Sequence, residues 1–115
     1  MQNAKTDINQ AAIVAALRAI GCRVQTLHQV GQGVPDLLVG YRGTNLLIEI
    51  KTLTGKLNPL QTAWHTQWPG QVIIVHTPAE AIQFVDQLSL ETPQWQVQNT
   101  KLLINKLKKH TKPLP

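Results

Sequence analysis

The sequence predicts a single α/β domain, with its elements in the order α-β-β-β-α-β-α and a mixed central sheet flanked by helices. Three observations support this prediction. Residues 7–20 repeat apolar side chains at helical spacing. Residues 35–51 contain two apolar runs separated by a turn, which is typical of a β-hairpin. Residues 71–77 form a continuous apolar run, as expected of a buried strand.

The first part of the chain predicts a helix followed by a short strand. Thr6 or Asp7 can cap the helix over residues 7–20. Residues 22–30 carry an apolar side chain at every third position and predict the strand. Cys22, the single cysteine, is expected to be an ordinary buried residue, because free cysteines are among the most buried residue types.

The hairpin strands are predicted over residues 35–41 and 45–51, and a helix follows them. Asn58 caps this helix and Pro59 occupies its first position, which is the position that proline tolerates best. Helical spacing favours a core location for three of its large side chains, namely Leu60, Trp64 and Trp68.

The last third of the chain predicts the strand over 71–77, then a helix that extends through Leu88. Thr77 and Glu80 have the spacing of a capping box at the start of that helix. A further helix over 101–110 carries leucine and isoleucine on one side and lysine on the other. We therefore divide the chain into a domain over residues 1–98 and a basic C-terminal helix and tail over residues 99–115.

Composition limits the classes of function. The chain has 115 residues, 43% hydrophobic, and none of its apolar runs approaches the roughly 18 residues of a membrane span. The polar N-terminus lacks the apolar core of a signal peptide, and a single cysteine fits a reducing compartment, so an intracellular, cytoplasmic location without membrane contact is expected. The net charge of +5 favours a polyanionic partner such as nucleic acid.

Charged residues gather on one face of the predicted hairpin. If Gly43 and Thr44 form its loop, Asp36 lies opposite Lys51, and Glu49 projects to the same side. The other face is apolar throughout and is expected to face the core; it carries Leu37, Val39, Tyr41, Leu46, Ile48 and Ile50.

Two interpretations of this charged face remain open. It can be a solvated strand face with an ion pair between Asp36 and Lys51. Alternatively, because two neighbouring carboxylates repel each other unless a cation lies between them, Asp36 and Glu49 can bind a metal. Hard oxygen ligands would suit Mg²⁺ or Mn²⁺.

The same residues resemble the signature of a nuclease family. Pro35-Asp36 followed by Glu49-Ile50-Lys51 is similar to the PD-(D/E)xK pattern. The downstream sequence GKLNPLQTAWHTQW resembles the VRR-NUC branch, in which a loop of the form GKLSPxQ leads into a helix with a glutamine and an aromatic residue, here Gln61 and Trp64. The resemblance covers about residues 7–88 and is greatest to stand-alone, single-domain members from phages and bacteria.

This resemblance implies a restriction endonuclease-like core and a DNA endonuclease that depends on Mg²⁺ or Mn²⁺. Asp36, Glu49 and the backbone carbonyl of Ile50 would bind the metal. Lys51 would orient or deprotonate the attacking water, or stabilise charge in the transition state. Gln61 would point into the site and bind the water or Lys51.

The sequence departs from the branch at the first helix. Nucleases of this branch usually carry a glutamate there that completes the metal site, and this helix has none. Asp7 and Gln10 are the possible replacements, so a one-metal site is better supported than a two-metal site. Two alternatives follow: a nucleic-acid-binding or assembly module that lacks catalysis, and a nuclease subunit that takes its specificity from a partner.

DNA, branched or duplex, is the expected partner. The stand-alone relatives imply branched substrates such as four-way junctions, and cutting two strands most simply requires a homodimer. The last helix fits a phosphate-contacting arm, a solvated lysine face, or a dimer contact through its apolar side. His65 is expected to be exposed or in contact with DNA. The residues predicted to contact DNA are Lys56, His65, Lys101, Lys106, Lys108 and Lys109.

Overall fold

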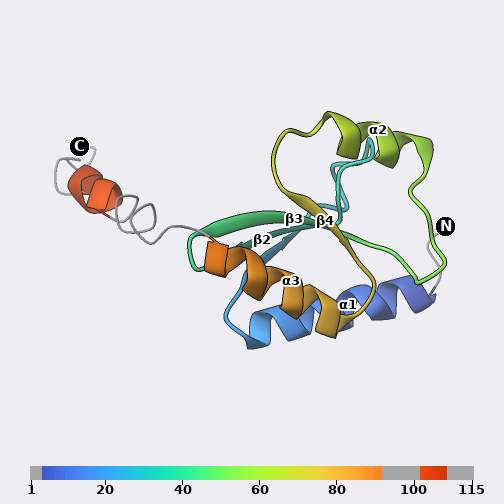
Figure 1. Cartoon of the computed structure of the whole chain (residues 1–115), viewed down its shortest axis with the longest axis horizontal. Coiled ribbons are helices and arrows are strands. Elements are labelled where there is room, and N and C mark those ends of the chain that lie inside the picture. The colour runs from blue at the N-terminus through green and yellow to red at the C-terminus, as the bar shows by residue number, and fades with distance from the viewer. Residues whose placement is uncertain (1–3, 92–101, 109–115) are drawn as a thin grey trace.

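The computed structural model describes residues 4–91 and 102–108, with side chains from residue 8 onward. Its elements follow the predicted order, which confirms the mixed α/β architecture (Figure 1). They are α1 (Ala4–Ala19), β1 (Arg23–Thr26), β2 (Leu37–Tyr41), β3 (Thr44–Ile50), α2 (Pro59–Gln67), β4 (Val72–Val75) and α3 (Pro78–Glu91).

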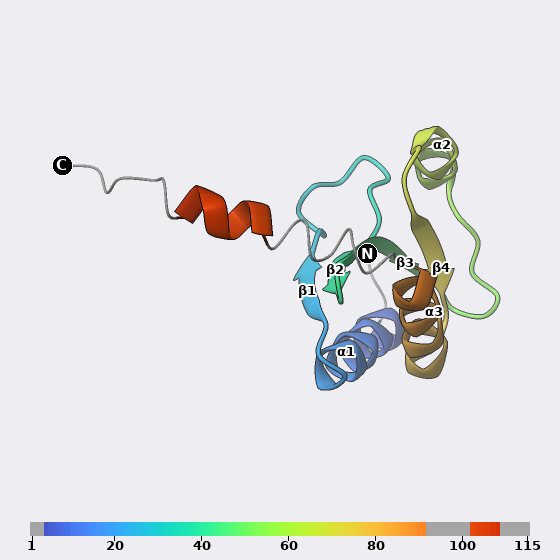
Figure 2. The same cartoon turned by 60° about the vertical axis from the view of Figure 1, so that its left-hand side comes forward.

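The four strands form one mixed sheet in the order β1-β2-β3-β4. β2 pairs antiparallel with both β1 and β3, and β4 pairs parallel with β3. α1 and α3 lie side by side against one face of the sheet, whereas α2, in the crossover from β3 to β4, lies on the other side (Figures 1 and 2). The two faces of the sheet therefore have different surroundings.

The hydrophobic core fills the space between the sheet and the helices α1 and α3. The predicted core face of the hairpin is confirmed, since five of its six residues are buried and Tyr41 is half-buried. Each fully buried aliphatic side chain stabilises the fold by roughly 1.5–3 kcal/mol. Cys22 is buried as predicted, and burial raises the pKa of its thiol to about 11. The buried apolar residues are Ile13, Val14, Leu17, Cys22, Val24, Leu37, Val39, Leu46, Ile48, Ile50, Val75, Ala81 and Val85.

The hairpin loop lies one residue earlier than predicted. Arg42 and Gly43 form it, with φ angles of 48° and 81°, and Tyr41 pairs with Thr44. Positive φ at both positions is typical of the turn that best suits the twist of a hairpin. The prediction placed Thr44 in the loop, where its β-branched side chain is disfavoured at positive φ, and the structure makes it a buried strand residue instead.

The corrected register changes the partner of Asp36. Leu37 pairs with Ile48, and continuing this register places Asp36 opposite Glu49. The predicted pairing of Asp36 with Lys51 is therefore wrong. Because the register differs by two residues, every side chain keeps the face predicted for it. The hairpin consequently brings two carboxylates directly opposite each other.

The strand before the hairpin is shorter than predicted. β1 ends at Thr26, four residues before the predicted end. The N–H group of Leu27 donates to the backbone carbonyl of Asp36 at 2.8 Å, and a turn closed by the N–H of Val30 and the carbonyl of Leu27 follows. The β1–β2 pairing thus ends at Leu37, and Asp36 immediately precedes β2.

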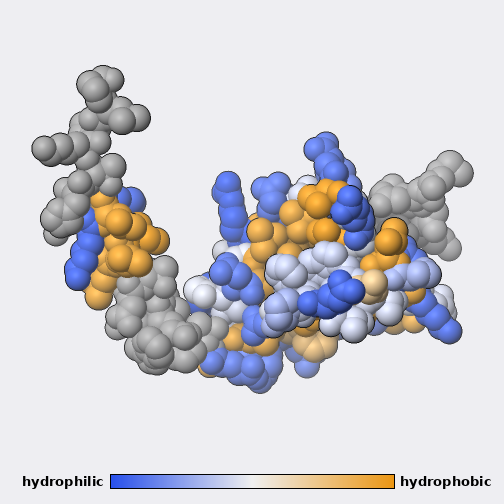
Figure 3. Space-filling model, turned by 90° about the horizontal axis from the view of Figure 1, so that it is seen from above, coloured by the Kyte–Doolittle hydropathy of each residue, from blue (hydrophilic) through white to orange (hydrophobic). Residues whose placement is uncertain are grey.

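Two helices differ from prediction in their limits. α1 begins at Ala4, so Thr6 and Asp7 lie within the helix and do not cap it. The structure describes the predicted last helix over residues 102–108, where all seven side chains are exposed and hydrophobic residues lie beside lysines (Figure 3). The predicted boundary between residues 98 and 99 lies outside the described residues. Within the described segments, every helix is too short or too polar to span a bilayer.

α2 begins as predicted but does not enter the core. Asn58 caps it and Pro59 occupies its first turn. None of its residues is buried: Leu60 is 64% exposed and Trp68 43%. The predicted core location of Leu60, Trp64 and Trp68 is wrong, because α2 lies on the face of the sheet opposite α1, α3 and the core (Figure 1). The rings of Trp64 and Trp68 stack on each other instead, with their centroids 4.7 Å apart.

A glycine lets the loop before β2 approach the start of α2. Gly33 has a φ of +82°, and a Cβ at this position would lie 2.4 Å from the carbonyl oxygen of Leu60. Gly31 also has a positive φ, +72°, but a Cβ there would meet no atom within 4 Å. Close contact between loop and helix therefore depends on Gly33.

We predict that Gly33→Ala destabilises the protein more than Gly31→Ala. Both substitutions place a side chain at positive φ, which costs roughly 1–2 kcal/mol. Only Gly33→Ala adds a clash with backbone, for which we expect about 1–3 kcal/mol more. Urea unfolding measures the difference, and equal free energies of unfolding for the two variants would contradict the packing of this loop on α2.

Candidate active site

Two carboxylates and a lysine lie at the end of the β2–β3 hairpin that is remote from its turn. Asp36 immediately precedes β2, Glu49 is the penultimate residue of β3, and Lys51 follows that strand. The Oδ2 atom of Asp36 accepts a hydrogen bond of 2.7 Å from the N–H group of Ile50. This bond fixes the Asp36 carboxylate across the strand pair, beside Glu49.

Glu49 is the centre of this cluster, and its side chain is only 2% exposed. Its Oε2 atom accepts a hydrogen bond of 3.4 Å from Nε2 of Gln61, and Nζ of Lys51 lies 3.9 Å from the same oxygen. Its Oε1 atom lies 3.8 Å from Nε2 of His65. Glu49 is therefore enclosed by residues of its own hairpin and of α2.

α2 presents Gln61 and His65 to Glu49 from successive turns of one helix face. The Oε1 atom of Gln61 accepts from the N–H group of Asn58 at 3.0 Å, and Oδ1 of Asn58 accepts from the N–H group of Gln61 at 2.9 Å. Because the helix cap holds the amide oxygen, the amide nitrogen is directed to Glu49. Gln61 was predicted to bind the water or Lys51, whereas the structure gives it Glu49 as a partner.

Burial dominates the electrostatics of the site. The pKa of Glu49 is raised to about 8: burial is the largest cause, the charge of Asp36 and a hydrogen bond with that carboxyl group add to it, and the charge of Lys51 acts in the opposite direction. The attraction of the Lys51 charge does not outweigh burial, because Nζ of Lys51 lies 3.9 Å from Oε2 of Glu49, at the limit of ion-pair distance. Burial, followed by the charge of Lys51, lowers the pKa of His65.

The residues present fit a divalent cation with oxygen ligands. Oε1 of Glu49 is buried without a hydrogen-bond partner, and a second carboxylate adjoins it. Such a pair is destabilised when both members are ionised, and a cation relieves that repulsion. Asp36, Glu49 and the carbonyl of Ile50 would hold Mg²⁺ or Mn²⁺. Among the described residues, no three His, Cys, Asp or Glu side chains already converge as a metal site.

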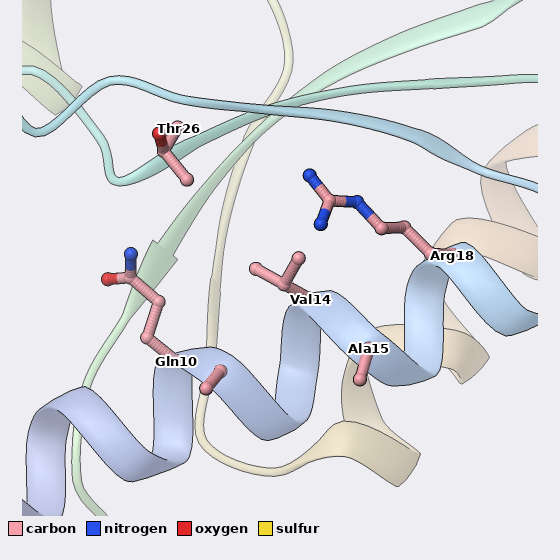
Figure 4. Close-up of a pocket in the computed structure, with 6 residues that line it drawn as sticks. Gln10, Val14, Ala15, Arg18 and Thr26 are labelled. Atoms are coloured by element: carbon pink, nitrogen blue, oxygen red, sulfur yellow. The ribbon is translucent and has the colours of Figure 1, made fainter.

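The first-helix candidates have different outcomes. Gln10 lines a groove between α1 and β1 together with Val14 and Arg18, and its amide points toward Thr26 (Figure 4). Thr26 pairs with Leu37, so Gln10 stands at the end of the sheet where Asp36 precedes β2. The side chain of Asp7 lies outside the described part of the chain, and its part in the site stays a prediction.

The predicted DNA contacts fall into three groups. Lys56 is exposed in the loop before α2, and Lys106 and Lys108 are exposed on the helix over 102–108. Lys101 and Lys109 lie outside the described residues. His65 was expected to be exposed or in contact with DNA, and its ring is only 12% exposed and lies against Glu49. The predicted exposure of His65 is therefore wrong, and its contact with DNA stays a prediction.

Comparisons with known proteins identify the fold. A scan against models of protein families finds no match, and no curated protein matches the sequence. A solved structure described as a VRR_NUC domain matches with a TM-score of 0.62, covering 73% of this chain and 97% of that chain at 24% sequence identity. The chain has the fold of a VRR-NUC domain. The resemblance inferred from the sequence is thereby confirmed at the level of the fold.

Within this VRR-NUC fold, His65 is the site residue whose position the sequence analysis missed. Its spacing of four residues from Gln61 was the available signal, because such residues share one helix face. The helical spacing of Trp64 and Trp68 outweighed that signal, because it predicted that the apolar side of α2 would face the core.

We predict that the stability of the protein in metal-free buffer falls as pH rises from 6.5 to 8, by about 1 kcal/mol per pH unit. Folded Glu49, whose pKa is raised from 4.5 to about 8, keeps a proton that the unfolded chain has already released. The lowered pKa of His65 offsets a small part of this fall up to about pH 7.5, because the unfolded imidazole still releases its proton there, and above that pH the imidazole is neutral in both states.

Urea unfolding across this pH range provides the measurement. Glu49→Gln should flatten the dependence, because an amide has no proton to lose. Glu91→Gln, which removes an exposed carboxylate at the end of α3, should leave the dependence unchanged. A wild-type protein with constant stability over this range would contradict the raised pKa of Glu49.

Proposed function

We propose that the protein is a metal-dependent endonuclease that hydrolyses phosphodiester bonds in DNA. The observation that carries this proposal is the cluster of Asp36, Glu49 and Lys51, in which a buried carboxyl group adjoins a second carboxyl group and a lysine. The VRR-NUC fold supports it, because the sequence resemblance associates that fold with nucleases. The net charge of +5 suits a polyanionic substrate.

The proposed chemistry divides between the cation and the side chains around it. When bound, Mg²⁺ or Mn²⁺ would neutralise phosphate charge and lower the pKa of a water molecule. Asp36 and Glu49 would hold the cation with the carbonyl of Ile50, and Gln61 would keep Glu49 in orientation through its hydrogen bond. Glu49 would lose its proton on metal binding, so the affinity for metal should increase with pH.

In this proposal Lys51 acts on the substrate. Its side chain is 19% exposed, and its Nζ atom is 3.9 Å from Glu49, so the ammonium group lies at the edge of the cluster. A lysine there can stabilise the negative charge that develops on the phosphate. It can also orient or deprotonate the attacking water. We favour stabilisation of charge or orientation, because a neutral lysine would require a strongly lowered pKa.

Branched DNA, such as a four-way junction, is the proposed preferred substrate, and a homodimer is the proposed active form. Two active sites related by a two-fold axis would cut two strands of one junction. The helix over 102–108 supports this proposal, because it exposes a hydrophobic side that can contact a second copy and lysines that can contact phosphates. Its exposed hydrophobic residues are Leu102, Leu103, Ile104 and Leu107.

A binding module without catalysis is the second candidate function. The first helix lacks the glutamate that usually completes the metal site, and the described residues contain no ready group of three metal-binding side chains. Such a protein would bind DNA through its lysines without cutting it. A subunit that depends on a partner for specificity would also fail to cut alone.

We predict that the wild-type protein cuts DNA in Mg²⁺ or Mn²⁺ and that Asp36→Ala abolishes cutting. Each protein is incubated with a labelled four-way junction, a flap, plain duplex and single-stranded DNA in each metal. The junction should be cut fastest if the proposed selectivity is correct. Tight binding by the wild-type protein without cutting in either metal would instead favour the binding module.

A second prediction concerns Lys51→Ala, which should lower the cleavage rate at saturating DNA by at least about 100-fold. DNA affinity should change by less than about threefold, because the substitution removes a group that acts on the reacting phosphate. Lys56→Ala is the matched control, since this exposed lysine should affect affinity without lowering the saturated rate. Equal losses of affinity and rate in Lys51→Ala would make Lys51 a binding residue only.

A further inference from the structure

The proposed mechanism leaves one buried group of the site without a role. The ring of His65 is 12% exposed, and its Nε2 atom is buried without a hydrogen-bond partner. The Oε1 atom of Glu49, which is also buried and without a partner, lies 3.8 Å away. Buried polar atoms usually have partners, since leaving one unsatisfied costs about 1–3 kcal/mol. The two atoms therefore suggest a shared partner.

The distance between the two atoms indicates what that partner is. A direct hydrogen bond would require about 2.7–3.2 Å. A bridging water would require roughly 4–5 Å between its two partners, and neither atom is exposed to water. A divalent cation, with bonds of about 2.0–2.2 Å, holds neighbouring ligands roughly 3–4 Å apart. The observed 3.8 Å lies within the range for a cation.

Both groups are held in orientation by their neighbours. Gln61 and Lys51 lie at the Oε2 atom of Glu49, so the other oxygen of the carboxyl group is directed to His65. Trp64 meets the ring of His65 edge-on, with centroids 6.0 Å apart, and stacks in turn on Trp68. The imidazole thus contacts an aromatic ring as well as the carboxyl group.

We propose that His65 binds the catalytic cation through Nε2, together with Glu49. The proposal rests on the proposed function, because the cation is the same one. Since no three described His, Cys, Asp or Glu side chains already converge, binding would draw Asp36 and His65 toward Glu49. A nitrogen ligand shifts metal preference away from Mg²⁺, which takes oxygen ligands, toward Mn²⁺ and Co²⁺.

Electron paramagnetic resonance of bound Mn²⁺ tests this proposal without relying on activity. The wild-type protein should show hyperfine coupling to an imidazole nitrogen, and His65→Ala should lose it. The affinity for Mn²⁺ should fall about 10-fold or more in His65→Ala, whereas the affinity for Mg²⁺ should change by less than about threefold. His28→Ala is the matched control, because it removes an exposed imidazole in the turn after β1.

The outcomes separate this inference from the proposed function. Nitrogen coupling in the wild-type protein and in His28→Ala, but not in His65→Ala, would support the ligand. Binding of Mn²⁺ without nitrogen coupling would overturn the role of His65 and leave the carboxylate metal site intact. No binding of Mn²⁺ to the wild-type protein would overturn both. Metal-free unfolding of His65→Ala shows whether the variant is folded, and His65→Gln replaces it if it is not.

Discussion

The enclosure of Glu49 between the hairpin and α2 is the interaction on which the candidate site depends. A carboxyl group removed from water needs partners. The pairing of β2 with β3 brings Asp36 beside Glu49, Lys51 follows β3, and Gln61 comes from α2. Burial outweighs the charge of Lys51, so Glu49 retains a proton near neutral pH. Under the proposed function, a divalent cation would supply the greater positive charge that ionises Glu49.

α2 contributes side chains to the candidate site and none to the buried core. None of its residues is buried, and its contacts with the rest of the molecule include the approach of Gly33 to Leu60 and the cluster at Glu49. Elements with few buried apolar contacts open most easily. A ligand that joins α2 to the hairpin would therefore stabilise the helix and the site together.

The hydrophobic core and the candidate site lie on opposite faces of the sheet. One face packs against α1 and α3 and contains the aliphatic core, while the other carries the carboxyl groups beneath α2. Because successive strand residues point to opposite faces, β3 contributes Ile48 and Ile50 to the core and Glu49 to the site. The packed core behind the sheet therefore supports the backbone that carries Glu49.

Local patterns in the sequence determined the order of the elements, the core face of the hairpin and the cap of α2, since each depends on periodicity or a short motif. The PD and EIK motifs also identified the fold that the comparison found. The pairing of Asp36 with Glu49 was not predictable in this way, because a register shift of two residues leaves the hydrophobic pattern of both faces unchanged.

Only the tertiary structure decided which way α2 faces. Leu60 and the two tryptophans have the spacing of a core-facing stripe, but the helix lies on the face of the sheet opposite the core, where Gln61 and His65 meet Glu49. Spacing along a helix shows which side chains share a face, but not what that face contacts. The contact with Glu49 arises because the parallel crossover from β3 to β4 places α2 opposite α1 and α3.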